Sequence, residues 1–177
     1  MLDFAIDTAK EAGSILMEHF GNISTYNKKS SDIDLVTIAD TQSEKYIIDK
    51  IKSTFPKHDI IAEESDLINN SSKYRWVVDP LDGTTNFAAG IPYWAISIAR
   101  FTNGQPETAF LDIPALKKRI LAIKGKGVWL NNKPLKPETR LKKNSDCISL
   151  CSRSIKVLQI KPEQSFPGKI RLLGVSS

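Results

Sequence analysis

The segment that most constrains this 177-residue chain runs from Arg75 to Phe87 and reads RWVVDPLDGTTNF. It begins as an apolar strand and then breaks into two carboxylates, Asp79 and Asp82, at a turn enforced by a proline and a glycine. Unpaired charges at the end of an apolar strand repel each other, so we expect a cation between them. The carbonyl of Leu81 adds a third hard oxygen, and such a set of ligands suits Mg²⁺.

Polar side chains follow this turn at Thr84, Thr85 and Asn86, and they are predicted to cap the start of a helix. A helix N-terminus favours an anion, so a cation site and an anion site would lie side by side. That combination is typical of metal-assisted phosphoryl chemistry. The alternative interpretation is an ordinary turn, because proline and glycine are favoured in turns for conformational reasons alone.

Composition indicates a globular chain, since 41% of the residues are hydrophobic. No apolar run approaches the roughly 18 residues of a membrane span, and the acidic amphipathic N-terminus does not resemble a signal peptide. No histidine lies near Cys147 and Cys151, which argues against zinc and favours reduced thiols. We therefore expect a cytoplasmic protein without a membrane partner.

The net charge of +5 conceals an asymmetry between the two parts of the chain. Residues 1–115 contain 10 Lys+Arg and 17 Asp+Glu, whereas residues 116–177 contain 15 and 3. A basic segment can indicate nucleic acid or another anionic partner. These lysines are spread through expected turns and strand ends without interleaved aromatic residues. We therefore favour a solvated surface, or a face for another partner, over nucleic-acid binding.

Hydrophobic spacing predicts two helices, Asp3 to Phe20 and Asp40 to about Phe55, the second ended by a proline. Asp40 is predicted to be the N-cap of the second helix, with Glu44 behind it. A short strand from Asp59 to Ala62 would then deliver Glu63 to its end. If this strand neighbours the one that ends at Asp79, the two carboxylates meet at one rim of the sheet.

Closely spaced strands with short turns are predicted after the central segment. They cover 93–101, 108–112, 119–124 and 127–130, with turns at Asn103-Gly104, at Gly125 and over residues 131–134. Two further strands are predicted over 147–152 and 169–173, with a linker over 136–144 and a short helix within 154–166. A helix pair followed by a meander predicts an α+β fold with both helices on one face of an antiparallel sheet.

Three motifs give the chain a resemblance to a known family. They are DLVTIAD at Asp34–Asp40, AEES at Ala62–Ser65 and DPLDGTTNF at Asp79–Phe87. In this order and spacing they resemble the inositol monophosphatase family of Mg²⁺-dependent, lithium-sensitive phosphatases. The resemblance implies the layered α/β sandwich of the inositol and sugar phosphatases. It also implies hydrolysis of a phosphate monoester of a small polyol or sugar.

The resemblance also implies roles for individual residues. Mg²⁺, or Mn²⁺ in its place, would be held by the side chains of Glu63, Asp79 and Asp82 and by the carbonyl of Leu81. The catalytic residues would be Asp40 and Thr84, which position the attacking water, together with Glu63. The phosphate would be bound by the backbone of Gly83, Thr84 and Thr85. The alternative is a non-catalytic metal-binding or regulatory member that performs no turnover.

The chain stops at Ser177, where members of the resembled family continue with a Trp-Asp pair that supplies a further metal ligand. We expect a first unit over residues 1–144 that carries the metal site, and a second α/β unit over 145–177 that is incomplete. The expected consequences are weak turnover and self-association, as a homodimer or through the C-terminal strands.

Overall fold

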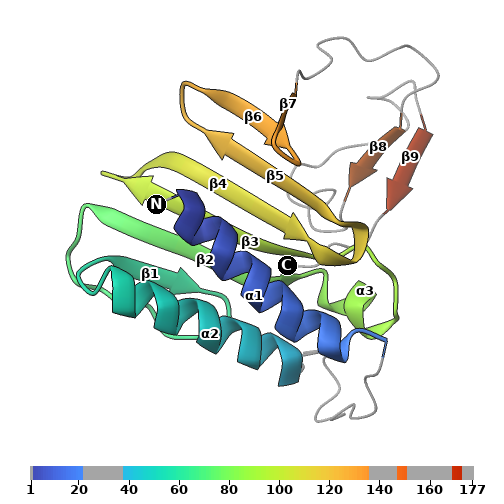
Figure 1. Cartoon of the computed structure of the whole chain (residues 1–177), viewed down its shortest axis with the longest axis horizontal. Helices are drawn as coiled ribbons and strands as arrows, with labels where there is room; N and C mark the ends of the chain where they lie inside the picture. The colour runs from blue at the N-terminus through green and yellow to red at the C-terminus, as the bar shows by residue number, and fades with distance from the viewer. Residues whose placement is uncertain (1, 22–37, 136–146, 151–168, 173–177) are drawn as a thin grey trace.

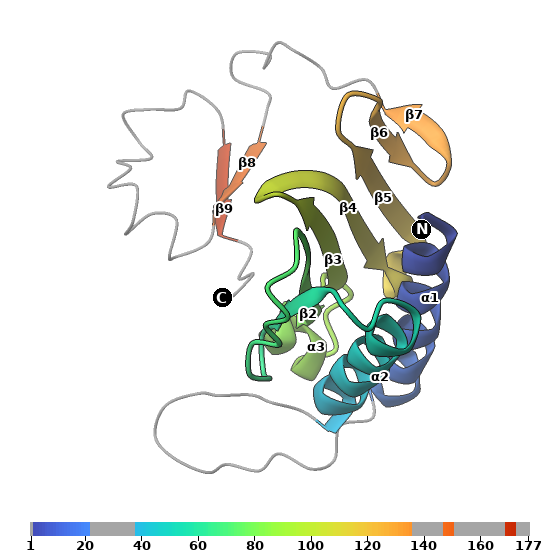
Figure 2. The ribbon, with the colours of Figure 1, turned by 90° about the vertical axis from the view of Figure 1, so that its left-hand side faces the viewer.

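The computed structural model describes residues 2–21, 38–135, 147–150 and 169–172, and it confirms the α+β fold class (Figure 1). Two long helices cover one face of a seven-stranded sheet, and a separate two-stranded ribbon follows (Figure 2). The elements are α1 (Leu2–His19), α2 (Ile38–Thr54), β1 (Asp59–Ala62), β2 (Tyr74–Asp82), α3 (Thr84–Ala88), β3 (Ala95–Thr102), β4 (Gln105–Ile113), the 3-10 helix η1 (Pro114–Leu116), β5 (Lys118–Ile123), β6 (Gly127–Leu130), β7 (Lys133–Leu135), β8 (Cys147–Leu150) and β9 (Lys169–Leu172). Within the described part of the chain, every helix is too short or too polar to cross a bilayer.

The two long helices form as the hydrophobic spacing predicts, with bounds that differ from the prediction by one or two residues. Each helix buries one stripe of residues three or four apart. The buried residues include Ala5, Ala9, Ala12 and Leu16 on α1, and Ile47, Ile48 and Ile51 on α2. The small side chains on α1 allow this helix to pack closely on its neighbours, so both helices are held near the centre of the sheet.

The start of α2 corrects one prediction. The helix begins at Ile38, so Asp40 lies inside its first turn and is not its N-cap. Asp40 faces inward and is only 2% exposed. A carboxylate in the first helical turn still has a favourable interaction with the helix dipole. Asp40 also interacts with the charges of Glu63 and Glu64, which follow β1.

The sheet is mixed, which corrects the prediction of a wholly antiparallel sheet. Its strands lie in the order β1 to β7, and each neighbouring pair from β2 onward is antiparallel. By contrast, β1 and β2 are parallel, with Ala62 opposite Val78. The connection over residues 63–73 brings the chain back to the end of the sheet at which β1 begins. Because parallel strands end at the same edge, Glu63 and Asp79 are brought next to each other.

The predicted meander is confirmed, with one change at its end. Asn103 and Gly104 both have positive φ, as a two-residue turn between right-twisted strands requires. Asn131 and Asn132 form a second turn of this kind, with φ of 47° and 66°. The predicted turn was too long, because residues 133–135 after the two asparagines pair with β6 as strand β7.

Aromatic side chains fix the short helix α3 below the carboxylates. Phe87 on α3 is fully buried, and its ring lies 4.9 Å from that of Trp94 and 5.5 Å from that of Phe20, between ring centroids. Buried aromatic rings contribute large apolar areas, and ring pairs at this spacing add a further attraction. The turn before α3 is therefore anchored to both α1 and β3.

The C-terminal strands are confirmed in the part that the structure describes. Strands β8 and β9 pair in parallel, with Cys147 opposite Lys169. The predicted linker over 136–144 and the predicted helix within 154–166 lie outside the described residues. The division into units 1–144 and 145–177, and the self-association through the C-terminal strands, stay predictions.

A buried carboxylate, Asp59 at the start of β1, holds the β1–β2 connection in place. Its Oδ1 accepts hydrogen bonds from the backbone N–H of Asn70 at 2.8 Å and of Ser72 at 3.1 Å, and Arg75 donates to Oδ2 at 3.2 Å. Burial of Asp59 disfavours its charged form, but these hydrogen bonds outweigh that cost and lower its pKa. The ionised carboxylate therefore stabilises the native state.

We expect Asp59→Asn to lower the melting temperature at neutral pH, because the amide loses the charge that these donors stabilise. The depressed native pKa contributes stability above the unfolded value of 3.8, and this contribution is lost as the pH falls through the native pKa. The difference between wild type and variant should therefore shrink below about pH 4. Asp49→Asn, at an exposed Lys45–Asp49 pair, is the control. A difference that does not vary with pH would contradict this assignment.

Candidate metal and phosphate site

The candidate site lies at the rim of the sheet where β1 and β2 end. Glu63 follows β1 directly, and Asp79 and Asp82 belong to the last part of β2. The pairing of β2 with β3 shifts its register between Asp79 and Asp82, because Pro80 and Leu81 bulge out of the ladder. Leu81 is fully buried, while both aspartates are half-buried at the rim. The bulge thus anchors itself in the core and presents two carboxylates.

Local hydrogen bonds make this turn rigid. Oδ1 of Asp79 accepts the N–H of Leu81 at 3.1 Å, and the hydroxyl of Thr84 donates to the carbonyl of Leu81 at 3.1 Å. Gly83 has φ of 91°, and a Cβ there would lie 3.0 Å from the carbonyl oxygen of Tyr93. Only glycine combines this conformation with so close an approach to β3. Each residue of the turn is therefore constrained by its neighbours.

The predicted capping by Thr84, Thr85 and Asn86 is wrong. Gly83 occupies the N-cap position of α3, and no side chain caps that helix. Instead, the amide of Asn86 donates to the carbonyl of Tyr93 at 2.7 Å. The Thr84 hydroxyl is drawn back to Leu81, because a carbonyl three residues earlier lies within its reach.

The carboxylates at the rim interact strongly with one another. Burial, followed by the charges of Glu63 and Asp82, raises the pKa of Asp79 to about 8, and a hydrogen bond with Glu63 contributes to this rise. Burial and the charge of Glu63 also raise the pKa of Asp82. Three ionised carboxylates cannot share this edge without a compensating positive charge. A bound cation would relieve this repulsion.

The donor set fits a hard divalent cation, although it is not arranged as a closed coordination shell. Within the described ranges, no group of three His, Cys, Asp or Glu side chains is placed to hold a metal ion. The fit rests on Asp82, whose Oδ1 is buried and has no hydrogen-bond partner. A buried oxygen without a donor has a free-energy cost that a bound cation removes. Oxygen-only ligands are those that Mg²⁺ and Mn²⁺ prefer.

Asp40 approaches the same rim from α2. Burial raises its pKa to about 7, and the charges of Glu64, Glu63 and Glu44 add to the effect. A carboxyl group with this pKa exchanges a proton near neutral pH, as a general base requires. The four predicted acids are thus linked electrostatically through Glu63, which raises the pKa of Asp40, Asp79 and Asp82. Thr84 is connected instead by its hydrogen bond to the Leu81 carbonyl.

Glu44 is a supporting residue that the sequence interpretation missed. It is 4% exposed, and its carboxylate accepts the N–H of Glu64 at 2.9 Å and a hydrogen bond from the hydroxyl of Ser65. These bonds fix the loop that carries Glu63. The available signal was the four-residue spacing from Asp40, which places both acids on the same face of α2. Glu44 was instead interpreted as part of a helix cap.

A small cavity of about 160 Å³ adjoins Asp82. Its walls include the aromatic residues Tyr93 and Trp94 and the apolar residues Ile113 and Leu116. The indole N–H of Trp94 is buried without a hydrogen-bond partner. The sequence interpretation placed Tyr93 and Trp94 in a strand and gave them no part in the site.

Comparisons with known proteins agree with this arrangement. Residues 1–169 match the sequence profile of the inositol monophosphatase family. The chain is 35% identical over 135 residues to a fructose-1,6-bisphosphatase/inositol-1-monophosphatase of Thermotoga maritima, covering 76% of this chain and 52% of the relative. It is 42% identical over 136 residues to the Nus factor SuhB of Vibrio cholerae, covering 75% and 50%. The chain thus spans about half the length of the curated relatives it matches.

Solved structures extend the likeness to the fold. The extragenic suppressor protein suhB of Bartonella henselae superposes with a TM-score of 0.85 at 28% identity, covering 98% of this chain and 70% of that one. An IMPase of Thermotoga maritima gives a TM-score of 0.80 at 29% identity, with coverage of 98% and 68%. With the family description matching nearly the whole length and the strand ends carrying the expected acids, this chain belongs to the inositol monophosphatase family.

Proposed function

We propose that this chain carries the catalytic rim of a Mg²⁺-dependent phosphate monoester hydrolase that acts on a small polyol or sugar phosphate. The observation that carries the proposal is the buried, unpartnered Oδ1 of Asp82 beside an Asp79 whose pKa is raised to about 8. Such an arrangement is unfavourable in a purely structural turn and becomes favourable when a cation binds. The names of two relatives, a fructose-1,6-bisphosphatase/inositol-1-monophosphatase and an inositol monophosphatase, support the substrate class.

The cation would be held by the carboxylates of Glu63, Asp79 and Asp82 and by the Leu81 carbonyl. Mg²⁺, or Mn²⁺ in its place, would neutralise charge on the phosphate oxygens. Asp79 belongs to the rigid turn, whereas Glu63 is exposed and directly precedes a loop held by Glu44. A modest rearrangement of Glu63 away from its hydrogen bond with Asp79 would free both groups for the ion.

Asp40 and Thr84 are suited to positioning the attacking water. Thr84 donates a hydrogen bond to the Leu81 carbonyl, so the hydroxyl oxygen of Thr84 can accept a hydrogen bond from water. Asp40 has a pKa of about 7 and can take a proton at neutral pH. The phosphate would be met by the backbone N–H groups of residues 83–85, because the first N–H groups of a helix have no acceptor within it.

A regulatory role without turnover is the second candidate function, and the naming of a relative as Nus factor SuhB favours it. Because a relative is named a Nus factor, the expectation that this chain does not bind nucleic acid is not supported. The basic composition of residues 116–177 stays compatible with an anionic partner of that kind. Both candidates use the same fold, so the distinction between them rests on the chemistry at the rim.

We expect Asp79→Asn to have opposite effects with and without metal. In EDTA the variant should melt above the wild type, by a difference that grows as the pH rises from about 4 to about 8 and then levels off, because over this range the unfolded wild type gives up a proton that the native state retains. In Mg²⁺ at 100–1,000 times its Kd, the wild type should gain about 2–4 kcal/mol that the variant does not. Asp49→Asn is the exposed control. Equal Mg²⁺ stabilisation of both proteins would rule out Asp79 as a ligand.

A second prediction separates turnover from binding. Phosphate release from inositol 1-phosphate and fructose 1,6-bisphosphate should require Mg²⁺ and fall by about 10²–10⁴ in Asp40→Asn. The variant should still bind Mg²⁺ by calorimetry, because Asp40 is proposed to act on water rather than to ligate the ion. Calorimetry should also show that inorganic phosphate binds the wild type more tightly with Mg²⁺ than in EDTA.

Three outcomes bear on this proposal. Phosphate release that is unchanged by EDTA or by Asp40→Asn would contradict the assignment of the rim as the catalytic site. If Mg²⁺-dependent phosphate binding occurs without release from any ester, the regulatory candidate is favoured. If phosphate is neither bound nor released, the hydrolase proposal is wrong.

A further inference from the structure

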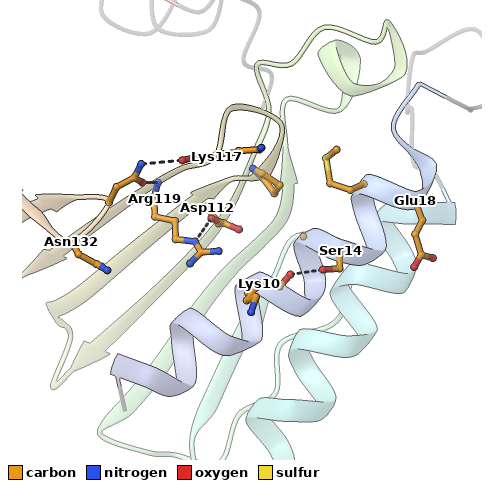
Figure 3. A pocket seen from close by; sticks show the side chains of 11 residues that line it. Lys10, Ser14, Glu18, Asp112, Lys117, Arg119 and Asn132 are labelled. Atoms are coloured by element: carbon orange, nitrogen blue, oxygen red, sulfur yellow. Dashed lines mark hydrogen bonds and ion pairs between the residues drawn. The ribbon is translucent and has the colours of Figure 1, made fainter.

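A cavity of about 730 Å³ lies between α1 and the β4–β5 end of the sheet, away from the carboxylate rim (Figure 3). It is lined by residues of α1, β4, η1, β5 and the turn before β7, and volumes of this size are typical of small-molecule sites. The helix touches the sheet at Gly13, where an added Cβ would lie 2.9 Å from Pro114 and 3.3 Å from Asp112. The cavity opens beside this contact.

The wall opposite α1 is built from paired polar groups. Asp112 is 4% exposed and accepts a hydrogen bond at 2.9 Å from Nε of Arg119, which leaves the terminal guanidinium nitrogens for another partner. The side chain of Asn131 accepts the N–H of Arg119 at 2.8 Å and donates to the carbonyl of Lys117 at 3.0 Å. Lys117 and Arg119 are therefore held in fixed backbone positions along one wall.

Charge is distributed unevenly along the cavity. Lys10 and Glu18 lie at opposite ends of the cavity along α1, and Lys117 and Arg119 face the helix from the wall formed by the sheet (Figure 3). Lys10 and Glu18 are eight residues apart on α1, or about 12 Å along its axis. The hydroxyl of Ser14, between them, donates to the carbonyl of Lys10 and retains its acceptor capacity. The cationic end suits a phosphate group, and the Ser14–Glu18 end suits hydroxyl groups that donate.

The cavity shares a wall with the smaller cavity beside Asp82. Asp112 and Pro114 face the large cavity, whereas Ile113 and Leu116 line the small one. The connecting element is η1, which has only three residues and ends at Lys117 in a left-handed conformation with φ of 52°. A ligand that contacts Lys117 therefore acts directly on the segment that forms the wall of the second cavity.

We propose that the cavity between α1 and β5 is an effector site for a phosphorylated, hydroxyl-bearing small molecule, coupled through η1 to the cavity beside Asp82. The phosphate contacts Lys10, Lys117 and the free nitrogens of Arg119, and the hydroxyl groups contact Ser14 and Glu18. Binding at this site does not depend on the proposed hydrolase activity, because none of these side chains belongs to the carboxylate rim.

The test uses ribose 5-phosphate and inorganic phosphate as probes, titrated calorimetrically into the full chain in EDTA, which removes the metal from the rim. We expect ribose 5-phosphate to bind more tightly than inorganic phosphate. In Lys10→Gln/Lys117→Gln its Kd should rise about tenfold or more, because two charged donors are lost. Lys118→Gln/Lys126→Gln removes the same charge from lysines outside the cavity and should change Kd less than about twofold. Glu18→Gln should bring the Kd of ribose 5-phosphate closer to the Kd of inorganic phosphate.

No binding of ribose 5-phosphate to the wild type, or equal losses in the two double variants, would overturn the site. The coupling is followed by backbone amide chemical shifts. Ribose 5-phosphate should perturb Lys117 and Asn131 at the site and also Leu116 and Trp94 on the shared wall. Perturbations confined to Lys117 and Asn131 would overturn the coupling through η1.

Discussion

Repulsion among the carboxylates of Glu63, Asp79 and Asp82 is the constraint on which the rest of this structure depends. Burial and mutual charge raise the pKa of Asp79 to about 8, so the acids resist sharing the rim when all are ionised. The fold holds them there nevertheless. Such an arrangement lowers the stability of the metal-free protein, and a cation that satisfies the carboxylates recovers that stability. Local instability of this kind is typical of a binding site.

Three features of the fold keep these acids together. The parallel pairing of β1 and β2 brings two strand ends to one edge. The bulge at Pro80 and Leu81 buries apolar residues and turns Asp79 and Asp82 outward. Glu44 then binds the loop after Glu63 from the side of α2. These features involve β1, β2 and α2, so the arrangement of the carboxylates depends on contacts between elements as well as on the local turn.

The parts of the site that the sequence predicted are those fixed by local chemistry. Asp79 directly precedes a Pro-x-Asp-Gly turn and Asp82 belongs to it, so the position of both at a strand end could be inferred directly. The fold class followed from helix spacing and from short turns such as Asn103-Gly104. The mixed sheet could not be predicted with equal certainty, because the direction of β1 is decided by an eleven-residue connection anchored on Asp59.

Longer-range contacts account for what the sequence did not show. Glu44 binds residues twenty and twenty-one positions away, and nothing in its immediate neighbourhood indicates those partners. Thr84 was expected to cap a helix, but it found a nearer acceptor in the Leu81 carbonyl. The cavity between α1 and β5 combines residues about a hundred positions apart, so only the folded chain reveals it. Tertiary proximity, rather than local preference, decides these features.

The most direct test of the central claim is anomalous diffraction from crystals of this chain soaked in Mn²⁺. We expect one strong anomalous peak at the rim, about 2.0–2.3 Å from oxygens of Asp79 and Asp82 and from the Leu81 carbonyl. Glu63 should also rotate toward the ion and lose its hydrogen bond with Asp79. A fully occupied Mn²⁺ elsewhere, with no peak at these carboxylates, would contradict the claim that Glu63, Asp79 and Asp82 form a metal site.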